Sequence, residues 1–158
     1  MTRARCVLGD SGLRARFDAV RTAVITAERE VDALRHEIRG MRERVGQSHP
    51  PRLGWFDIKF GHGGMMDAEF VMQFLVLWQA RLHPELLANA GNIALLERAE
   101  SLGLLPEGVG HAAASAYRSL RQVQHQARLN EASSQVPDTS LSAERDAICV
   151  LWDTVFLV

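Results

Sequence analysis

The segment that most constrains the fold is the apolar stretch of residues 65–82, which follows a cluster of glycines. A helix drawn through it has apolar side chains on every side: Met65, Met66, Phe70, Val71, Met72, Phe74, Leu75, Val76, Leu77 and Trp78. Because a helix without a polar face is normally buried, the stretch predicts the central helix of a bundle. Gln73, Gln79 and Arg81 interrupt it, so it is too short and too polar to span a bilayer.

Weaker helical periodicity fills most of the remaining chain. Apolar residues keep three-to-four spacing from Leu13 to Val45, where either one bent helix or two would fit. We favour two helices, with Thr26 as the N-cap of the second. Further amphipathic segments predict helices over residues 92–102, 110–130 and 140–156, with Asn92 as a cap.

The segments between these helices carry turn chemistry. Residues 46–54 contain two prolines and two glycines, and residues 131–139 are polar with one proline, so both predict loops. In residues 55–59 the pattern of apolar and polar side chains alternates well enough to predict a short extended segment. We therefore expect an all-α fold, an antiparallel bundle of five to six helices with one glycine-rich irregular segment and no convincing strand pair.

Length and charge narrow the possible functions. The 158 residues suit one domain, residues 13–158, while residues 1–12 show no helix-start signal and would belong to something preceding it. A net charge of -1 gives no electrostatic reason to expect binding to nucleic acid or to an anionic membrane. Cys6 and Cys149 have no paired spacing, which is typical of free thiols without a role in a reducing compartment. We therefore expect a cytoplasmic protein.

The glycine-rich segment before residue 65 is the most functional-looking part of the sequence. Gly61, Gly63 and Gly64 lead into the start of a helix, whose free N–H groups can bind an anion, and Lys59, the only lysine in the chain, lies just upstream. The spacing fits neither a Walker loop nor a dinucleotide fingerprint, so a tight structural turn is the favoured reading and a ligand site the alternative.

Three other patterns bear on possible chemistry. Asp67 and Glu69 diverge by about 200° on a helix, which argues against a two-metal centre built from this pair. The histidines show no zinc spacing, and we predict no metal site and no catalytic residue in the chain. A second polar pattern places four residues on one helical face, which is either solvated or meets a partner or ligand: Tyr117, Arg121, His125 and Arg128.

The segment FDIKFGHGGMMDAEFVMQFLVL resembles the stretch that follows the nucleotidyltransferase domains of bacterial glutamine-synthetase adenylyltransferases, the bifunctional adenylyl-transferring and adenylyl-removing enzymes. The likeness continues through HPELLANAGNIALLERAESLGLLP and AYRSLRQVQHQARL, and upstream through TRARCVLGD and MRERV. PII uridylyltransferases carry a looser version. The chain is thus similar to the terminal helical domain of such an enzyme, with residues 1–12 as the tail of its nucleotidyltransferase domain or a linker.

The resemblance implies an enzyme that transfers AMP from ATP, with Mg²⁺, to a tyrosine of glutamine synthetase under control by glutamine and the PII signal protein. The catalytic elements would lie in the preceding domain, so this chain alone is expected to be inactive and to hold no cofactor. We expect it to pack on that domain and to line its nucleotide cleft with Lys59, Gly63, Gly64 and Asp67, supported by Glu69 and Gln73.

Two rival hypotheses remain open at this point. The chain could be a regulatory module that binds glutamine, PII or glutamine synthetase through the face of Tyr117, Arg121, His125 and Arg128. It could also be a scaffold that only positions the catalytic domain.

Overall fold

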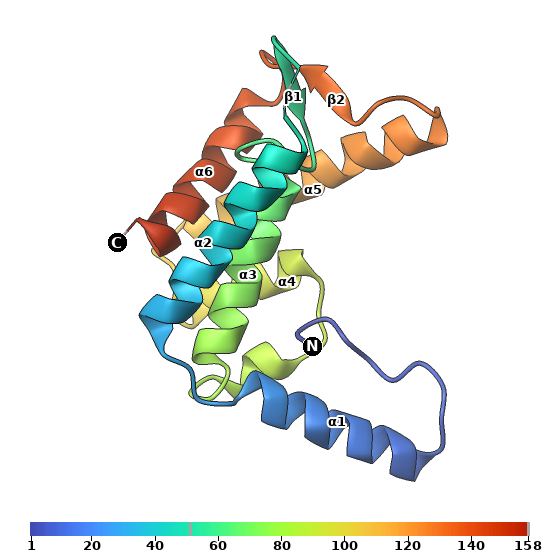
Figure 1. Ribbon diagram of the computed structural model, residues 1–158, viewed down its shortest axis with the longest axis vertical. Coiled ribbons are helices and arrows are strands. Elements are labelled where there is room, and N and C mark those ends of the chain that lie inside the picture. The colour runs from blue at the N-terminus through green and yellow to red at the C-terminus, as the bar shows by residue number, and fades with distance from the viewer. Residues whose placement is uncertain (51, 158) are drawn as a thin grey trace.

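The computed structural model describes residues 1–50 and 52–157 of the chain (Figure 1). Pro51, inside the predicted loop, and Val158, at the end of the predicted domain, lie outside the described residues. The helices are α1 (Ser11–Ile25), α2 (Val31–Ser48), α3 (Met65–Gln79), the 3₁₀ helix η1 (Pro84–Leu87), α4 (Asn92–Ser101), α5 (Val109–Leu129) and α6 (Ser142–Phe156). Within the described ranges these elements confirm the predicted, mainly all-α fold.

Helix α3 is the centre of the bundle, as its apolar sequence predicts. It contacts α2, α4, α5 and α6, and α2 runs beside it in the opposite direction (Figure 1). Val71, Phe74 and Leu75 have no exposed surface. Phe74 packs at 5.2 Å, ring centroid to ring centroid, against Phe156 near the end of α6. The core is therefore built around one helix that is covered from several sides.

A short antiparallel strand pair corrects the sequence prediction. β1 (Trp55–Asp57) pairs with β2 (Gln135–Pro137), with Phe56 opposite Val136. The ladder continues past both strands, because the amide of Ile58 donates to Ser134 O at 3.0 Å. Three-residue strands leave almost no periodicity, and a proline in β2 is tolerated only because the strand lies at an edge.

Helix ends differ from the sequence prediction in their capping. Two separate helices do fill residues 11–48, but Thr26 ends α1, and Glu30 caps α2 by accepting from the Ala33 amide at 2.9 Å. Gly91, not Asn92, is the N-cap of α4, because the Asn92 side chain is turned into the protein. The start of α5 is capped by Glu100 of α4, whose carboxylate accepts hydrogen bonds from the amides of Gly108 and His111. These hydrogen bonds lower the pKa of Glu100.

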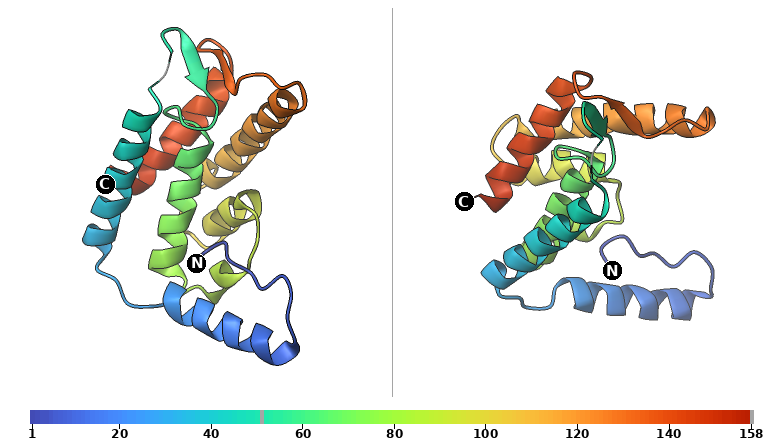
Figure 2. Two further views of the ribbon diagram at one scale, coloured as in Figure 1. Left: turned by 45° about the vertical axis from the view of Figure 1, so that its right-hand side comes forward. Right: turned by 45° about the horizontal axis from the view of Figure 1, so that its top comes forward.

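Helix α1 lies apart from the other helices, as both views of Figure 2 show. Only Arg21 and Ile25 are buried along its length. Arg21 donates to Leu87 O at 2.7 Å and to Thr2 O at 2.9 Å, and so it joins the N-terminal segment to the turn after α3. The first residues of the N-terminal segment are thus in contact with the bundle, and Asp10 supplies the N-cap of α1.

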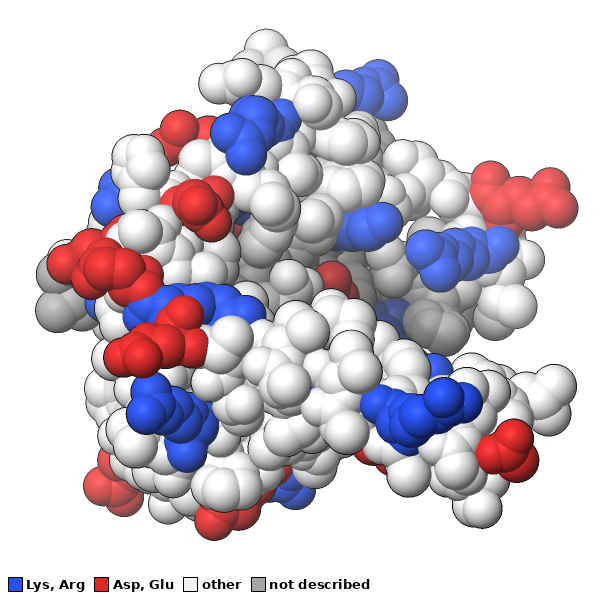
Figure 3. All heavy atoms as spheres, turned by 60° about the horizontal axis from the view of Figure 1, so that its bottom comes forward, with Lys and Arg blue, Asp and Glu red and all other residues white. Residues whose placement is uncertain are grey.

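The surface carries mixed charge. The face drawn in Figure 3 shows basic and acidic side chains interspersed, with neutral surface between them. None of the described helices is both long and apolar enough to cross a membrane.

Candidate functional site

The glycine-rich segment folds as a tight turn against α6. Gly63 adopts a φ of +78°, and a Cβ there would lie 2.8 Å from the Arg145 carbonyl oxygen and 2.9 Å from the Cys149 sulfur. A Cβ on Gly64 would lie within 3.0 Å of two backbone carbonyl oxygens. Both positions therefore require glycine for close packing, which supports the structural-turn reading of the sequence.

The start of α3 is not free to bind an anion. The amides of Met65, Met66 and Asp67 donate to Ile58 O, Lys59 O and Gly64 O at 2.9, 3.1 and 3.1 Å. These are the groups that a helix normally leaves without a partner. The expectation of a free helix N-terminus beside Lys59 is therefore wrong, because the preceding turn folds back and supplies the acceptors.

Asp67 is the centre of a buried ionic network. Its side chain is 3% exposed, pairs with the guanidinium of Arg42, and accepts from the Gly63 amide at 2.8 Å. Arg42 also donates to Phe60 O and Gly61 O at 3.2 Å each. One arginine of α2 and one aspartate of α3 thus hold the glycine turn in place.

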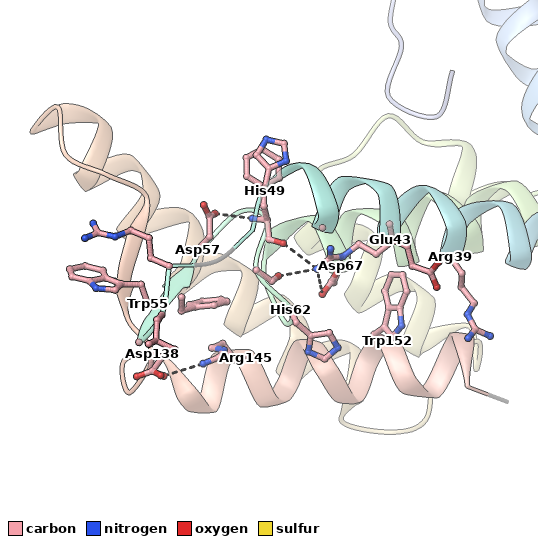
Figure 4. Close-up of a pocket in the computed structure, with 18 of the residues that line it drawn as sticks. Arg39, Glu43, His49, Trp55, Asp57, His62, Asp67, Asp138, Arg145 and Trp152 are labelled. Carbon is pink, nitrogen blue, oxygen red and sulfur yellow. Dashed lines mark hydrogen bonds and ion pairs between the residues drawn. The ribbon is translucent and has the colours of Figure 1, made fainter.

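A pocket of about 690 Å³ opens beside this network, between α2, β1, the glycine turn and α6 (Figure 4). Arg39, Arg52 and Arg145 line it together with Trp55 and Trp152. A volume of this size lies in the range of pockets that hold small ligands and cofactors, about 300–1,000 Å³. In Figure 4, Arg39 and Trp152 lie at one end and Trp55 at the other.

The charged side chains of this pocket differ in whether they already make hydrogen bonds or ion pairs within the protein. Asp57 accepts from the amides of Lys59 and Phe60 at 2.9 Å each, so it holds the turn as Asp67 does. Arg145 donates to Asp138 O at 3.0 Å and lies over the Phe56 ring at 4.4 Å. Arg39 makes no hydrogen bond or ion pair with the other described residues, so its guanidinium is available to a ligand.

His62 and Cys149 meet at the wall of the same pocket. The distance from Cys149 Sγ to His62 Nδ1 is 3.3 Å. Burial, followed by the charge of Asp67, raises the pKa of the Cys149 thiol. The thiol is therefore kept protonated and packs against the turn as a small neutral side chain.

A second polar cluster joins the two residue sets that the sequence singled out separately. The Tyr117 hydroxyl donates to Glu69 Oε1 at 2.7 Å and accepts from Asn92 Nδ2 at 3.0 Å. Arg3 donates to Asn92 Oδ1 at 2.6 Å. Burial and the Glu69 carboxylate raise the pKa of Tyr117 to about 12. Tyr117 is therefore a buried member of the core and not part of a solvated face.

The remaining sequence-predicted residues are spread out. The Lys59 ammonium lies over the Phe60 ring at 4.6 Å from its centroid, and Gln73 borders a separate, very small cavity. Arg121, His125 and Arg128 are exposed on α5. The structure thus places Asp67 at the 690 Å³ pocket. It places Glu69, Tyr117 and Arg121 at a smaller pocket and leaves the others without a common site.

Sequence reasoning missed the residues that build the large pocket. Arg39 and Arg42 belong to the arginine-rich helix α2, and neither was among the candidate site residues. The signal that could have found them is the charge of Asp67 in a mostly apolar helix, since a buried carboxylate requires a cationic partner. Among the described residues, no group of three or more His, Cys, Asp or Glu side chains is arranged to hold a metal ion.

Comparison with known proteins identifies the family. A family model described as GlnD PII-uridylyltransferase matches residues 32–137, which run from α2 to β2. The chain belongs to this family. The matched range contains the Arg42–Asp67 network, the glycine turn and, except for Arg3, the Tyr117 cluster.

Curated relatives of the family cover nearly the whole chain. It is 47% identical over 98% of its length to a bifunctional glutamine synthetase adenylyltransferase/adenylyl-removing enzyme of Bordetella bronchiseptica. Enzymes with the same description from Burkholderia pseudomallei and Neisseria meningitidis are 41% and 39% identical over 99% of it. The chain spans 17% of the length of each of these relatives. The resemblance predicted from the glycine-rich segment is thereby confirmed.

Proposed function

We propose that this chain is a helical domain of an enzyme that adenylylates a tyrosine of glutamine synthetase in nitrogen regulation. The observation that carries the proposal is the identity of 47% with a bifunctional adenylyltransferase/adenylyl-removing enzyme over 98% of the chain. ATP and Mg²⁺ would be bound by a nucleotidyltransferase domain elsewhere in the longer protein. Among the described residues, no group of three or more His, Cys, Asp or Glu side chains is arranged to hold that metal.

The proposed contact with the nucleotidyltransferase domain is the apolar stripe of α1. Leu13, Phe17, Val20 and Val24 follow one another at spacings of four, three and four, so they share a face of the helix. Leu13, Val20 and Val24 are 45%, 57% and 40% exposed. Contiguous exposed apolar side chains of this kind mark interaction sites, and a domain joined to the same polypeptide would cover them.

The proposed contribution to the nucleotide cleft is the 690 Å³ pocket and not the start of α3. Arg39 and Arg145 are suited to phosphate oxygens because a guanidinium donates several charge-assisted hydrogen bonds. Trp152 offers an aromatic face for a base. Asp67, Gly63 and Gly64 would then act as positioning residues, since they fix the turn and Arg42 behind the pocket wall.

The activity is tested by measuring AMP transfer from labelled ATP to glutamine synthetase. We expect none with this chain alone and clear transfer when it is joined to the nucleotidyltransferase domain. Transfer by the chain alone, or none by the joined protein, would contradict the proposal.

The cleft is tested separately, in the joined protein. Arg39→Gln is expected to raise the KM for ATP about tenfold, the value of one hydrogen bond to a charged group. Arg44→Gln, on the same helix but outside the pocket, is the matched control and should leave KM unchanged. Equal effects of the two variants would show that Arg39 does not contact nucleotide.

A further inference from the structure

A second pocket lies on the other side of α3 from the arginine-lined one. Its volume is about 280 Å³, and it shares no lining residue with the 690 Å³ pocket. Four parts of the chain contribute polar groups to it: the N-terminal segment provides Arg3, α3 provides Glu69, α4 provides Asn92, and α5 provides Tyr117, Arg121 and Gln124. The proposed transfer of AMP gives this pocket no role.

Gln124 places a side-chain amide at this pocket. The residue is 7% exposed, and no hydrogen bond joins its amide to the other residues that the structure describes. The amide atoms are not among the fully enclosed polar atoms that lack a partner, which are Arg21 Nε and Arg35 Nε in the described part of the chain, so they keep surface that is open to the pocket. An amide that lines a pocket without a protein partner is available to a group inside that pocket.

The charges around the pocket favour an anion. Arg3 and Arg121 are cationic, and Glu69 is the only acid in the lining, so the net charge is +1. Glu69 Oε1 is already engaged by the Tyr117 hydroxyl, and Arg3 is engaged by Asn92. Arg121 has no ion pair or hydrogen bond among the described residues. A guanidinium and an amide N–H₂ one helical turn apart on α5 therefore both lack acceptors.

We propose that this pocket binds a small organic oxyanion, which accepts hydrogen bonds from the guanidinium of Arg121 and the amide of Gln124. The volume of about 280 Å³ lies just below the typical range of about 300–1,000 Å³ for drug-sized ligands, so the pocket suits a small ligand. Because Arg3 borders the same pocket, an occupant would also tie the N-terminal segment to α5.

Binding to the 158-residue chain is tested by calorimetry and by the NMR signal of the Gln124 side-chain amide. The probes are succinate, inorganic phosphate and succinamide, the neutral counterpart of succinate. Binding of succinate with at least tenfold weaker succinamide supports a carboxylate ligand, and binding of phosphate alone supports a phosphate ligand. If neither anion binds at millimolar concentration, or if succinamide binds as well as succinate, the inference is wrong.

Variants on α5 then locate the site. Arg121→Gln is expected to weaken binding tenfold or more, because it removes a charge-assisted hydrogen bond. Arg128→Gln makes the same change in charge on the same helix outside the pocket, and it should bind as the parent does. Equal losses in the two variants would show non-specific attraction and overturn the assignment. These measurements use no ATP and no acceptor protein, so their failure would leave the AMP-transfer test unaffected.

Discussion

Helices α1 and α3 have the same length, 15 residues, and both carry repeated apolar side chains, but they end in opposite environments. Most of α3 is buried, including the charged Asp67. On α1 only Arg21 and Ile25 are buried, while Val20 remains 57% exposed. Apolar spacing therefore tells which side chains share a face of a helix, but not whether another part of the protein covers that face.

The difference has a thermodynamic consequence. Covering an apolar side chain stabilises the fold by about 25 cal/mol for each Å² removed from water. Helix α3 gains this stabilisation from contacts with four other helices. Helix α1 gains it only near its C-terminal end, where Arg21 and Ile25 are buried. The stability of this chain should thus depend on α3 far more than on α1, and substitutions can test that statement.

The largest effect is expected for Phe74→Ala in α3. Phe74 has no exposed surface and packs on Trp78 and Phe156, so truncation leaves a cavity and should cost about 3–5 kcal/mol of unfolding free energy. Phe17→Ala makes the same change in the half-buried side chain of α1 and should cost about 1 kcal/mol. Urea denaturation measures both, and equal costs would remove the contrast between the helices.

Asp67→Ala should come next, at about 3 kcal/mol. It leaves the guanidinium of Arg42, 12% exposed, without its buried partner and frees the Gly63 amide. Asp32→Ala is the control, because the 2.8 Å pair of Asp32 with Arg35 has the aspartate 83% exposed. Surface pairs contribute at most about 1 kcal/mol. A cost for Asp67→Ala as small as for Asp32→Ala would mean that the network does not hold the turn.

These two residues also show what the sequence can and cannot provide. Phe74 was correctly placed in a central helix, because a helix with apolar side chains on every side, and too short to span a bilayer, is normally buried in a core. Asp67 was expected to line a nucleotide cleft, because its partner Arg42 is 25 residues away and nothing in the local sequence joins the two. Pairing between distant segments depends on tertiary packing, which helical periodicity does not encode.

The same limit explains the other differences. Gly63 and Gly64 signal a turn in the sequence, but the carbonyl oxygens that occupy the start of α3 become visible only when the turn is folded. Tyr117 keeps a regular spacing with Arg121 and His125, yet it is buried and they are not. The β1–β2 pair was missed because it joins two three-residue strands from distant parts of the chain.

A smaller effect is expected for Tyr117→Phe, about 1–2 kcal/mol, from the loss of its hydrogen bonds to Glu69 and Asn92. The folded pKa of about 12 lies above the ordinary value of 10.0. The folded state therefore holds this proton more tightly, and the stability advantage over Tyr117→Phe should be complete below pH 10 and decline between pH 10 and 12.

The single tyrosine of the chain makes this measurable by the ultraviolet absorbance of phenolate. The folded chain should titrate near pH 12 and the urea-unfolded chain near pH 10. Coincident titrations would contradict the buried hydrogen-bonded phenol.

The smallest effect is expected for Val20→Ser on α1. In this chain it should change the free energy of unfolding by less than about 0.5 kcal/mol, because Val20 is 57% exposed. Joined to the nucleotidyltransferase domain, the same substitution should cost about 1 kcal/mol or more, as the stripe becomes covered. Denaturation of the two proteins side by side decides this, and identical small costs would show that the stripe stays uncovered.

The pairing of Phe56 with Val136 bears on how the chain unfolds. It joins the connection between α2 and α3 to the connection between α5 and α6, which are 80 residues apart in the sequence. The α2–α3 pair and the α5–α6 pair are therefore linked by the hydrogen bonds of the β1–β2 ladder. Unfolding of either pair alone would have to break this ladder and the contacts of the glycine turn. The segment from α2 to α6 is therefore expected to melt as a single cooperative unit, with α1 free to fray beforehand.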